Sequence, residues 1–274
     1  MNIDLTINTD VAQKILTGFI KSEVTRVGYS RAVIGLSGGI DSALSFVLAV
    51  EALGNDNVLA VRMPYKASSP DSLAHAEMLV EQYEVACETV EITDMVEPLF
   101  ATDPEMSKQR KGNIMARQRM IVLYDRSEAF KGLVIGTSNK TEILLGYSTL
   151  WGDMASALNL IGDLYKTQVR QLSRALEIPS VIIDKTPSAD LWIGQTDEGE
   201  LGFTYEEVDK LLYLLVDHRY SAQECVEEGF EEKFVNAVIR RVRLNQFKRM
   251  MPPIAKLSNR TIGYDFLYLR DWGT

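Results

Sequence analysis

Apolar and polar residues follow two different spacings along this chain, and the spacing predicts its secondary structure. Between Val11 and Val27 an apolar residue recurs every three or four positions, which predicts an amphipathic helix that packs against the rest of the protein. Short segments of strand character lie at residues 32–34, 58–61, 87–92 and 133–136. Helical patterns lie at residues 43 onwards, 70–83, 113–130, 140–146, 166–176, 205–216, 222–228 and 231–249.

The alternation of strands and helices predicts the fold class. Strand–helix–strand units build parallel sheets with helices on both faces. We therefore expect an α/β protein with a Rossmann-like three-layer α/β/α arrangement, a mostly parallel sheet and flanking helices. A chain of 274 residues with 46% hydrophobic residues buries a large core, and we expect one domain over residues 1–274. Ligands of open parallel sheets lie beyond the carboxyl ends of the strands, which places Ser37, Met63 and Thr137 on one rim.

Composition narrows the classes of partner. The formal net charge of −9 disfavours a nucleic-acid-binding surface. Two cysteines and two histidines are too few for a disulfide framework, a zinc knuckle or a histidine-based triad. The sequence has no apolar stretch long enough to span a membrane and no basic N-terminal segment followed by an apolar one. We expect a cytoplasmic protein that contacts neither nucleic acid nor membrane.

A glycine-rich turn joins the first predicted strand to the helix that follows it. Its sequence is Gly35-Leu36-Ser37-Gly38-Gly39-Ile40-Asp41-Ser42. Adjacent glycines let the backbone approach a ligand closely, and the N–H groups of such a turn point at an anion. A phosphate chain is the natural ligand, and because Asp41 would repel it, we expect Asp41 to hold a Mg²⁺ that bridges phosphate oxygens. The alternative is a tight turn in which serine and aspartate only cap the helix.

The turn differs from the common nucleotide-binding loops. No Gly-Lys-Ser/Thr follows the glycines, so it is not a Walker A loop, and it lacks the Gly-x-Gly-x-x-Gly dinucleotide spacing. Ser-Gly-Gly-x-Asp-Ser after a strand resembles the pyrophosphate-binding loop of the N-type ATP pyrophosphatases. That resemblance implies cleavage of ATP between its α and β phosphates and adenylation of the substrate.

Residues 186–202 are rich in turn-forming and acidic residues and show no helix or strand period. Irregular segments of this length are uncommon in compact domains and often close over active sites. We therefore expect a mobile lid at about residues 186–202, with an inert surface loop as the alternative.

Several further strings resemble a single family. They are Gly136-Thr137-Ser138-Asn139-Lys140-Thr141-Glu142, Leu145-Gly146-Tyr147-Ser148-Thr149-Leu150-Trp151-Gly152-Asp153, Gly162-Asp163-Leu164-Tyr165-Lys166-Thr167-Gln168, Pro187-Ser188-Ala189-Asp190-Leu191, Thr196-Asp197-Glu198 and Phe247-Lys248-Arg249. Together with the glycine-rich turn they resemble the ammonia-dependent NAD⁺ synthetases of the N-type ATP pyrophosphatase (adenine nucleotide alpha hydrolase-like) superfamily. The likeness covers most of the chain.

The resemblance implies amidation of the nicotinate carboxylate of deamido-NAD⁺, with ATP as co-substrate and ammonia as nitrogen donor. ATP adenylates the carboxylate with release of pyrophosphate, and ammonia then displaces AMP. Asp41, Lys166 and Ser188 are the implied catalytic residues, and Asp41 and Glu142 the implied ligands of Mg²⁺. The implied ATP site comprises Gly35, Leu36, Ser37, Gly38, Gly39, Ile40, Asp41, Ser42, Met63, Thr137, Lys166 and Ser188. Glu142 as an ordinary surface charge is the alternative.

The resemblance also implies a deamido-NAD⁺ site at the interface of a homodimer. Its residues are Arg117, Asp153, Phe247 and Lys248, although solvated surface charges would explain the arginine and the lysine equally well. The interface includes the long helix and the region after Glu142. Apolar candidates for it, which an internal core would also use, are Met115, Met120, Ile121, Leu144, Leu145, Leu150 and Trp151.

The chain departs from many stand-alone bacterial members at Leu150, Ala157 and Phe247, where those members carry Lys, Asp and His. Residues 148–154 look more like the synthetase domain of glutamine-dependent members, which carry an additional N-terminal amidase domain. This chain has no room for such a domain and no Cys-Glu-Lys constellation before Ser37. We therefore expect free ammonia as the nitrogen donor, with a separate glutaminase subunit as the alternative source.

Two other functions share the same turn. One is a different adenylating ATP pyrophosphatase, such as a GMP-synthetase-like or tRNA-thiolating enzyme; the acidic composition and the positions of Cys87 and Cys225 argue against thiolation of tRNA. The other is a non-catalytic module that senses ATP or AMP. The pairing of Asp41 with Glu142, together with Lys166 and a lid, argues against that module.

Overall fold

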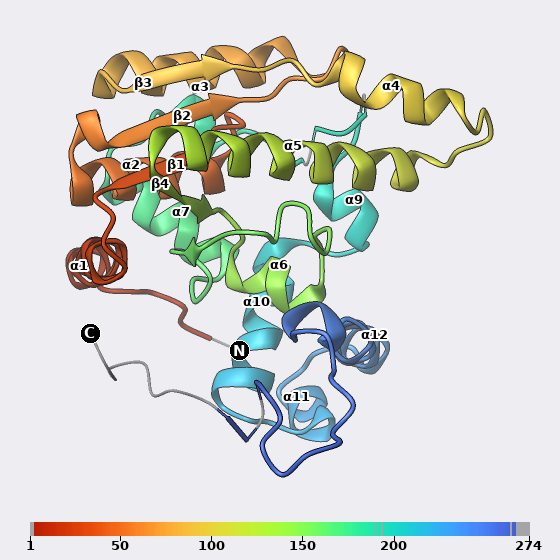
Figure 1. Cartoon of the computed structure of the whole chain (residues 1–274). Coiled ribbons are helices and arrows are strands. Elements are labelled where there is room, and N and C mark those ends of the chain that lie inside the picture. The colour runs from red at the N-terminus through yellow and green to blue at the C-terminus, as the bar shows by residue number, and fades with distance from the viewer. Residues whose placement is uncertain (1–2, 189, 193, 264, 267–274) are drawn as a thin grey trace.

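The computed structural model describes residues 3–188, 190–192, 194–263 and 265–266, and its centre is a parallel sheet of five strands in the order β3-β2-β1-β4-β5 (Figure 1). The strands are β1 (Arg31–Gly35), β2 (Val58–Arg62), β3 (Ala86–Thr89), β4 (Gly132–Gly136) and β5 (Leu158–Asn159). Every pairing between neighbouring strands is parallel. The predicted α/β fold class with a parallel sheet and flanking helices is confirmed.

Helices cover both faces of this sheet. The α-helices in the described part of the chain are α1 (Thr9–Arg26), α2 (Ile40–Leu53), α3 (Pro70–Tyr83), α4 (Thr93–Ala101), α5 (Lys108–Phe130), α6 (Lys140–Leu145), α7 (Lys166–Ala175), α8 (Ser180–Ile183), α9 (Asp197–Leu201), α10 (Tyr205–Leu212), α11 (Ala222–Glu227) and α12 (Glu232–Leu244). Short helical turns complete the set: η1 (Asn55–Asn57), η2 (Tyr213–Asp217) and η3 (Gln246–Arg249).

Alternate residues of the central strands serve two separate cores. Ile34 of β1 packs with α1, α2, α3, α7 and α8, whereas its neighbour Val33 packs with α4 and α5 on the opposite face. Both side chains are fully buried, which explains why the strand sequences are continuously apolar. A third core lies beside the sheet, where Leu145 of α6 packs with α10, α11 and α12. The cavity described below lies at the carboxyl ends of the central strands, next to these cores.

The structure corrects several predicted boundaries. The third strand ends at Thr89 rather than residue 92, α4 and the two-residue β5 were not predicted, and α12 ends at Leu244 rather than residue 249. The first helix is confirmed, and its Ile20 and Val24 are fully buried. Its Val11 and Ile15, expected in the same packed face, are 49% and 63% exposed. Within the described part of the chain, no helix combines the length and the apolar character needed to cross a membrane.

Candidate active site

A cavity of about 1100 Å³ opens at the carboxyl ends of β1, β2 and β4. Ser37, Met63 and Thr137, predicted to share one rim, all line it. The other predicted site residues that line it are Gly35, Leu36, Gly39, Ile40, Asp41, Ser42, Arg117, Glu142, Asp153, Lys166, Ser188, Phe247 and Lys248. Of the predicted ATP-site residues, Gly38 stands apart from the cavity lining. Residues as distant in the sequence as Leu36 and Lys248 therefore meet in one space.

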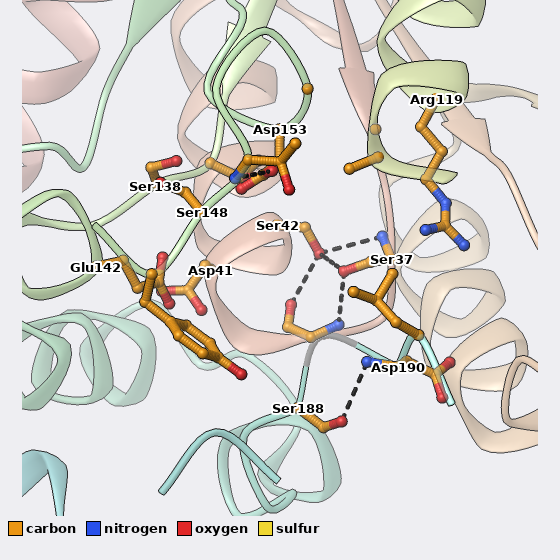
Figure 2. Close-up of a pocket in the computed structure, with 18 of the residues that line it drawn as sticks. Ser37, Asp41, Ser42, Arg119, Ser138, Glu142, Ser148, Asp153, Ser188 and Asp190 are labelled. Carbon is orange, nitrogen blue, oxygen red and sulfur yellow. Dashed lines mark hydrogen bonds between the residues drawn. The ribbon is translucent and has the colours of Figure 1, made fainter. Parts of the chain in front are cut away.

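Serine hydroxyls fix the turn between β1 and α2 (Figure 2). Ser42 Oγ accepts from Ser37 N at 3.2 Å and donates to Gly39 O at 2.9 Å, and it lies 2.9 Å from Ser37 Oγ. Ser37 Oγ in turn accepts from Gly39 N at 3.3 Å. These bonds fix the conformation of the turn at the edge of the cavity.

Gly38 has a packing role rather than a place in the cavity lining. Its φ is +76°, and a Cβ built on it would lie 2.1 Å from the backbone oxygen of Ser72 in α3. Only glycine combines this backbone conformation with so close an approach. At Gly39 a Cβ would meet nothing closer than Ser37 Oγ at 3.4 Å, so this position is left open for a ligand.

Three charged side chains meet at the inner end of the cavity, and we call them the charged centre: Asp41, Glu142 and Lys166. Lys166 Nζ forms an ion pair with Asp41 Oδ2 and lies 3.2 Å from Glu142 Oε1. The three side chains come from the first turns of α2, α6 and α7, and those of Lys166, Glu142 and Asp41 are 3%, 15% and 18% exposed. Asn139, which caps α6, donates from Nδ2 to Asp41 Oδ1 at 2.9 Å.

Burial governs the protonation of the charged centre. It raises the pKa of Glu142 to about 8, and Asp41 adds to this rise while Lys166 opposes it. Burial alone would lower the pKa of Lys166, but the attraction of Asp41 and Glu142 outweighs it, so its pKa is raised. Lys166 is therefore a firmly charged ammonium. Glu142 is protonated more easily than an ordinary glutamate.

Asp197 of α9 adds a further carboxylate that the sequence analysis did not assign to the site. It is 4% exposed and accepts from the hydroxyls of Tyr147 and Tyr205, each at 3.1 Å. Lys166 Nζ lies 5.1 Å from the centroid of the Tyr205 ring. Asp197 sits within the predicted lid, which is therefore not wholly irregular: α9 occupies its second half.

The first half of the predicted lid is fastened over the cavity, although Ala189 and Ile193 lie outside the described residues. Asp190 accepts from Ser69 N and Ser72 Oγ, both at 3.0 Å, at the N-terminus of α3. Leu191 packs so tightly on α5 that a Cβ on Gly112 would lie 2.9 Å from it. Ser188 Oγ accepts from Asp190 N at 3.1 Å, so this anchoring holds Ser188 at the cavity (Figure 2).

Arg119 is a half-buried cation in the cavity wall that the sequence analysis also missed. Its Nε donates to Met63 O, a neutral acceptor, at 3.0 Å, and burial lowers the pKa of its guanidinium. It lies on α5, two positions beyond Arg117, and no spacing rule distinguishes the two from sequence. Asn139, by contrast, was open to prediction, because Asn followed three residues later by Glu is a capping-box pattern.

Two residues that were predicted to bind the dinucleotide form hydrogen bonds with the loop that follows α6. Lys248 Nζ donates to Gly146 O and Ser148 O, both at 2.7 Å, and Arg117 donates to Leu150 O at 3.2 and 3.3 Å. Both cations thus contact neutral carbonyls beside the cavity. Of the predicted departures, Leu150 and Phe247 line the cavity whereas Ala157 does not.

The exposure of the apolar interface candidates shows which of them belong to an internal core and which lie at the surface. Met115 and Leu145 are 2% and 0% exposed and belong to internal cores, so they are unsuited to an interface. Ile121 on α5 and Trp151 in the loop after α6 are 54% and 47% exposed. Ile121 lies one helical turn beyond Arg117, and Trp151 follows Leu150, whose carbonyl Arg117 contacts.

The donor set at the charged centre fits a small divalent cation that shares its coordination with a substrate. Among the residues that the structure describes, no three or more His, Cys, Asp or Glu side chains gather to hold a metal ion on their own. Asp41 and Glu142 nevertheless converge on one ammonium nitrogen. Mg²⁺ prefers oxygen ligands and usually takes one or two carboxylates together with substrate phosphates, which suits this pair.

Comparison with known proteins yields consistent matches. The sequence model of the NAD synthase family matches residues 12–252. The NH(3)-dependent NAD(+) synthetase of Trichlorobacter lovleyi is 56% identical over 269 residues, which are 98% of this chain and 98% of that protein. Among solved structures, the NMN synthetase of Francisella tularensis superposes with a TM-score of 0.81 at 31% identity, covering 91% of this chain and 99% of its own. The NH3-dependent NAD synthetase of Campylobacter jejuni, solved with nitrate, gives a TM-score of 0.79 at 32% identity, covering 91% and 100%.

Proposed function

The chain belongs to the NAD synthase family, and we propose that Asp41, Glu142 and Lys166 form the centre at which it activates its substrate with ATP. Its reaction is the ATP-dependent amidation of deamido-NAD⁺ with ammonia, which forms a C–N bond. The observation that carries the assignment is the convergence of two carboxylates and one ammonium from three helix starts on one rim of the sheet.

The reaction divides into two displacements. A nicotinate carboxylate oxygen attacks the α phosphorus of ATP, the bond to the bridging oxygen breaks, and pyrophosphate leaves. Ammonia then attacks the acyl carbon, AMP departs with the electrons of the C–O bond, and the nitrogen loses a proton. Lys166 stabilises negative charge on the phosphate oxygens, and Ser188 adds a hydrogen bond from the lid. The N–H groups of the turn at residues 37–42 receive the pyrophosphate.

Mg²⁺ is the metal that we assign to Asp41 and Glu142. When bound, it neutralises charge on the phosphate chain. Asp41, Glu142 and the nearby Asp197 bring three carboxylates against the single charge of Lys166, which favours one more cation. The remaining cavity residues that we assign to ATP are those of the turn, Met63 and Thr137.

We assign deamido-NAD⁺ to the part of the cavity near Arg117, Asp153, Phe247 and Lys248. Arg117 and Lys248 contact only carbonyl oxygens in the bonds described above, so a dinucleotide pyrophosphate would gain two cations there. Leu150 supplies apolar surface in place of the lysine of many relatives. A homodimer in which Ile121 and Trp151 face the partner completes this part of the proposal.

An end-point assay tests the function directly. Purified protein with ATP and Mg²⁺ is expected to release pyrophosphate and form NAD⁺ when deamido-NAD⁺ and ammonium are both present. Glutamine in place of ammonium, or nicotinate mononucleotide in place of deamido-NAD⁺, is expected to give little product. Pyrophosphate and product formed equally with nicotinate mononucleotide would contradict the assigned acceptor. Tight AMP binding without pyrophosphate release in any mixture would instead indicate a non-catalytic module.

The dimer is tested by placing a charge on the proposed interface. Ile121→Lys is expected to convert the protein to a monomer in light scattering and to raise the KM for deamido-NAD⁺, because a buried lysine without a partner disrupts an apolar contact. Ile15→Lys is the matched control, since Ile15 is similarly exposed at 63% but lies on α1. Dimers of unchanged mass in both variants would remove Ile121 from the interface.

A further inference from the structure

A carboxylate lies behind the charged centre, outside the cavity. Asp209 of α10 has no exposed surface. Its Oδ1 accepts from Thr141 Oγ1 at 2.6 Å, and its Oδ2 accepts from Thr167 N at 2.8 Å. Both oxygens of this buried group are therefore engaged, and both partners lie at the beginnings of other helices.

The two partners of Asp209 are the immediate neighbours of the charged centre. Thr141 precedes Glu142 in the first turn of α6, and Thr167 follows Lys166 in the first turn of α7. Thr141 Oγ1 also accepts from the backbone N of Lys166 at 3.0 Å. One carboxylate thus joins the start of the helix that carries Glu142 to the start of the helix that carries Lys166.

Hydrogen bonds partly offset the cost of burying Asp209 at this junction. Burial raises the pKa of Asp209, and the hydrogen bonds from Thr141 and Thr167 oppose the rise. Two helix N-termini add favourable partial positive charge. An apolar residue would fill the same space without a desolvation cost, but it would leave Thr141 Oγ1 and Thr167 N without the acceptor that they share.

We propose that Asp209 is a positioning residue for the reaction. Through Thr141 and Thr167 it fixes the first turns of α6 and α7 relative to each other, and thereby places Glu142 and Lys166 around the phosphates of ATP. The inference rests on the proposed function of those two side chains. Asp209 touches no substrate, so its effect is entirely on geometry.

Asp217 offers a control for Asp209, because it also contacts residues at the starts of α6 and α7. This residue of η2 accepts from Lys140 Nζ at 2.8 Å and from Tyr165 OH at 2.5 Å. It therefore also connects α6 with the start of α7, but through side chains that do not line the cavity. Its own side chain is 35% exposed, so water replaces what Asp217→Asn removes.

The experiment compares Thr141→Val, Thr141→Ser, Asp209→Asn and Asp217→Asn in the full chain. Thr141→Val keeps the side-chain shape and deletes the hydroxyl, and a displacement of about 1 Å at a reacting group costs up to about 100-fold. We expect kcat to fall by about 10- to 100-fold in Thr141→Val and in Asp209→Asn, with a higher KM for MgATP and an unchanged KM for deamido-NAD⁺. Thr141→Ser and Asp217→Asn are expected to keep the parent values.

A merely structural role predicts a different pattern. Assayed well below the melting temperature of each variant, a protein that is only less stable keeps both KM values and its kcat. Parent-like kinetics in Thr141→Val and Asp209→Asn, or equal losses in Thr141→Ser and Thr141→Val, would overturn the positioning role. A parent enzyme that forms no NAD⁺ would overturn the proposed function instead, which the parent assay alone reveals.

Discussion

Replacing Lys166 with methionine is expected to lower kcat by about 1000-fold, because preorganised charge at a transferring phosphoryl group contributes about 100- to 1000-fold. The ammonium is 3% exposed and reaches both Asp41 and Glu142. At this low exposure, solvent does not compensate for the loss of the charge. Methionine fills nearly the same volume, so the loss reports on charge rather than on a cavity. Initial rates of pyrophosphate release at saturating substrates provide the measurement.

Lys140→Met is the matched control for this variant. Lys140 is the first residue of α6 as Lys166 is of α7, its side chain is 14% exposed, and it is paired with Asp163 and Asp217. It does not line the cavity. We expect it to keep parent activity with a lower melting temperature. Comparable losses of kcat in both variants would mean that general destabilisation, not the phosphate contact, explains Lys166→Met.

The sequence predicted those parts of the fold in which apolar residues follow a regular local pattern. The runs at β1, β2 and β4 are apolar because both faces of these strands are covered, and such runs are visible in a single sequence. β5 has only two residues, Leu158 and Asn159, which is too short for any period. Its place in the sheet depends on pairing with Ile135 and Gly136, a contact that no local pattern encodes.

The sequence predicted the site residues that belong to recognisable motifs. It missed those that only the tertiary fold brings to the site. Asp41 and Glu142 lie in sequence motifs that are recognisable in the single sequence. Asp197, Asp209 and Arg119 are charged residues of ordinary appearance, and charged residues are mostly exposed. Only the tertiary fold, which places them against tyrosines, helix starts and a carbonyl, makes them part of the site or its support.

We expect an equally large effect from removing the charge of either proposed metal ligand. Asp41→Asn and Glu142→Gln are each expected to lower kcat by about three orders of magnitude, because each variant removes a ligand of the cation that neutralises the phosphate chain. Both amides keep the size of the parent side chain, and Asn139 still caps α6 in either variant. The decisive measurement is a Mg²⁺ titration of ATP binding by calorimetry. Each variant should need far more Mg²⁺ for the same ATP affinity.

Asp163→Asn serves as the control for loss of one negative charge, since its side chain is 97% exposed and faces solvent near Lys140. It should match the parent in both kcat and Mg²⁺ dependence. If Asp41→Asn loses activity while its Mg²⁺ dependence stays that of the parent, Asp41 acts by orienting Lys166 and is not a metal ligand. The ion pair already seen between these two side chains makes that the sharpest rival explanation, because Lys166 loses one of its two anionic partners in either case.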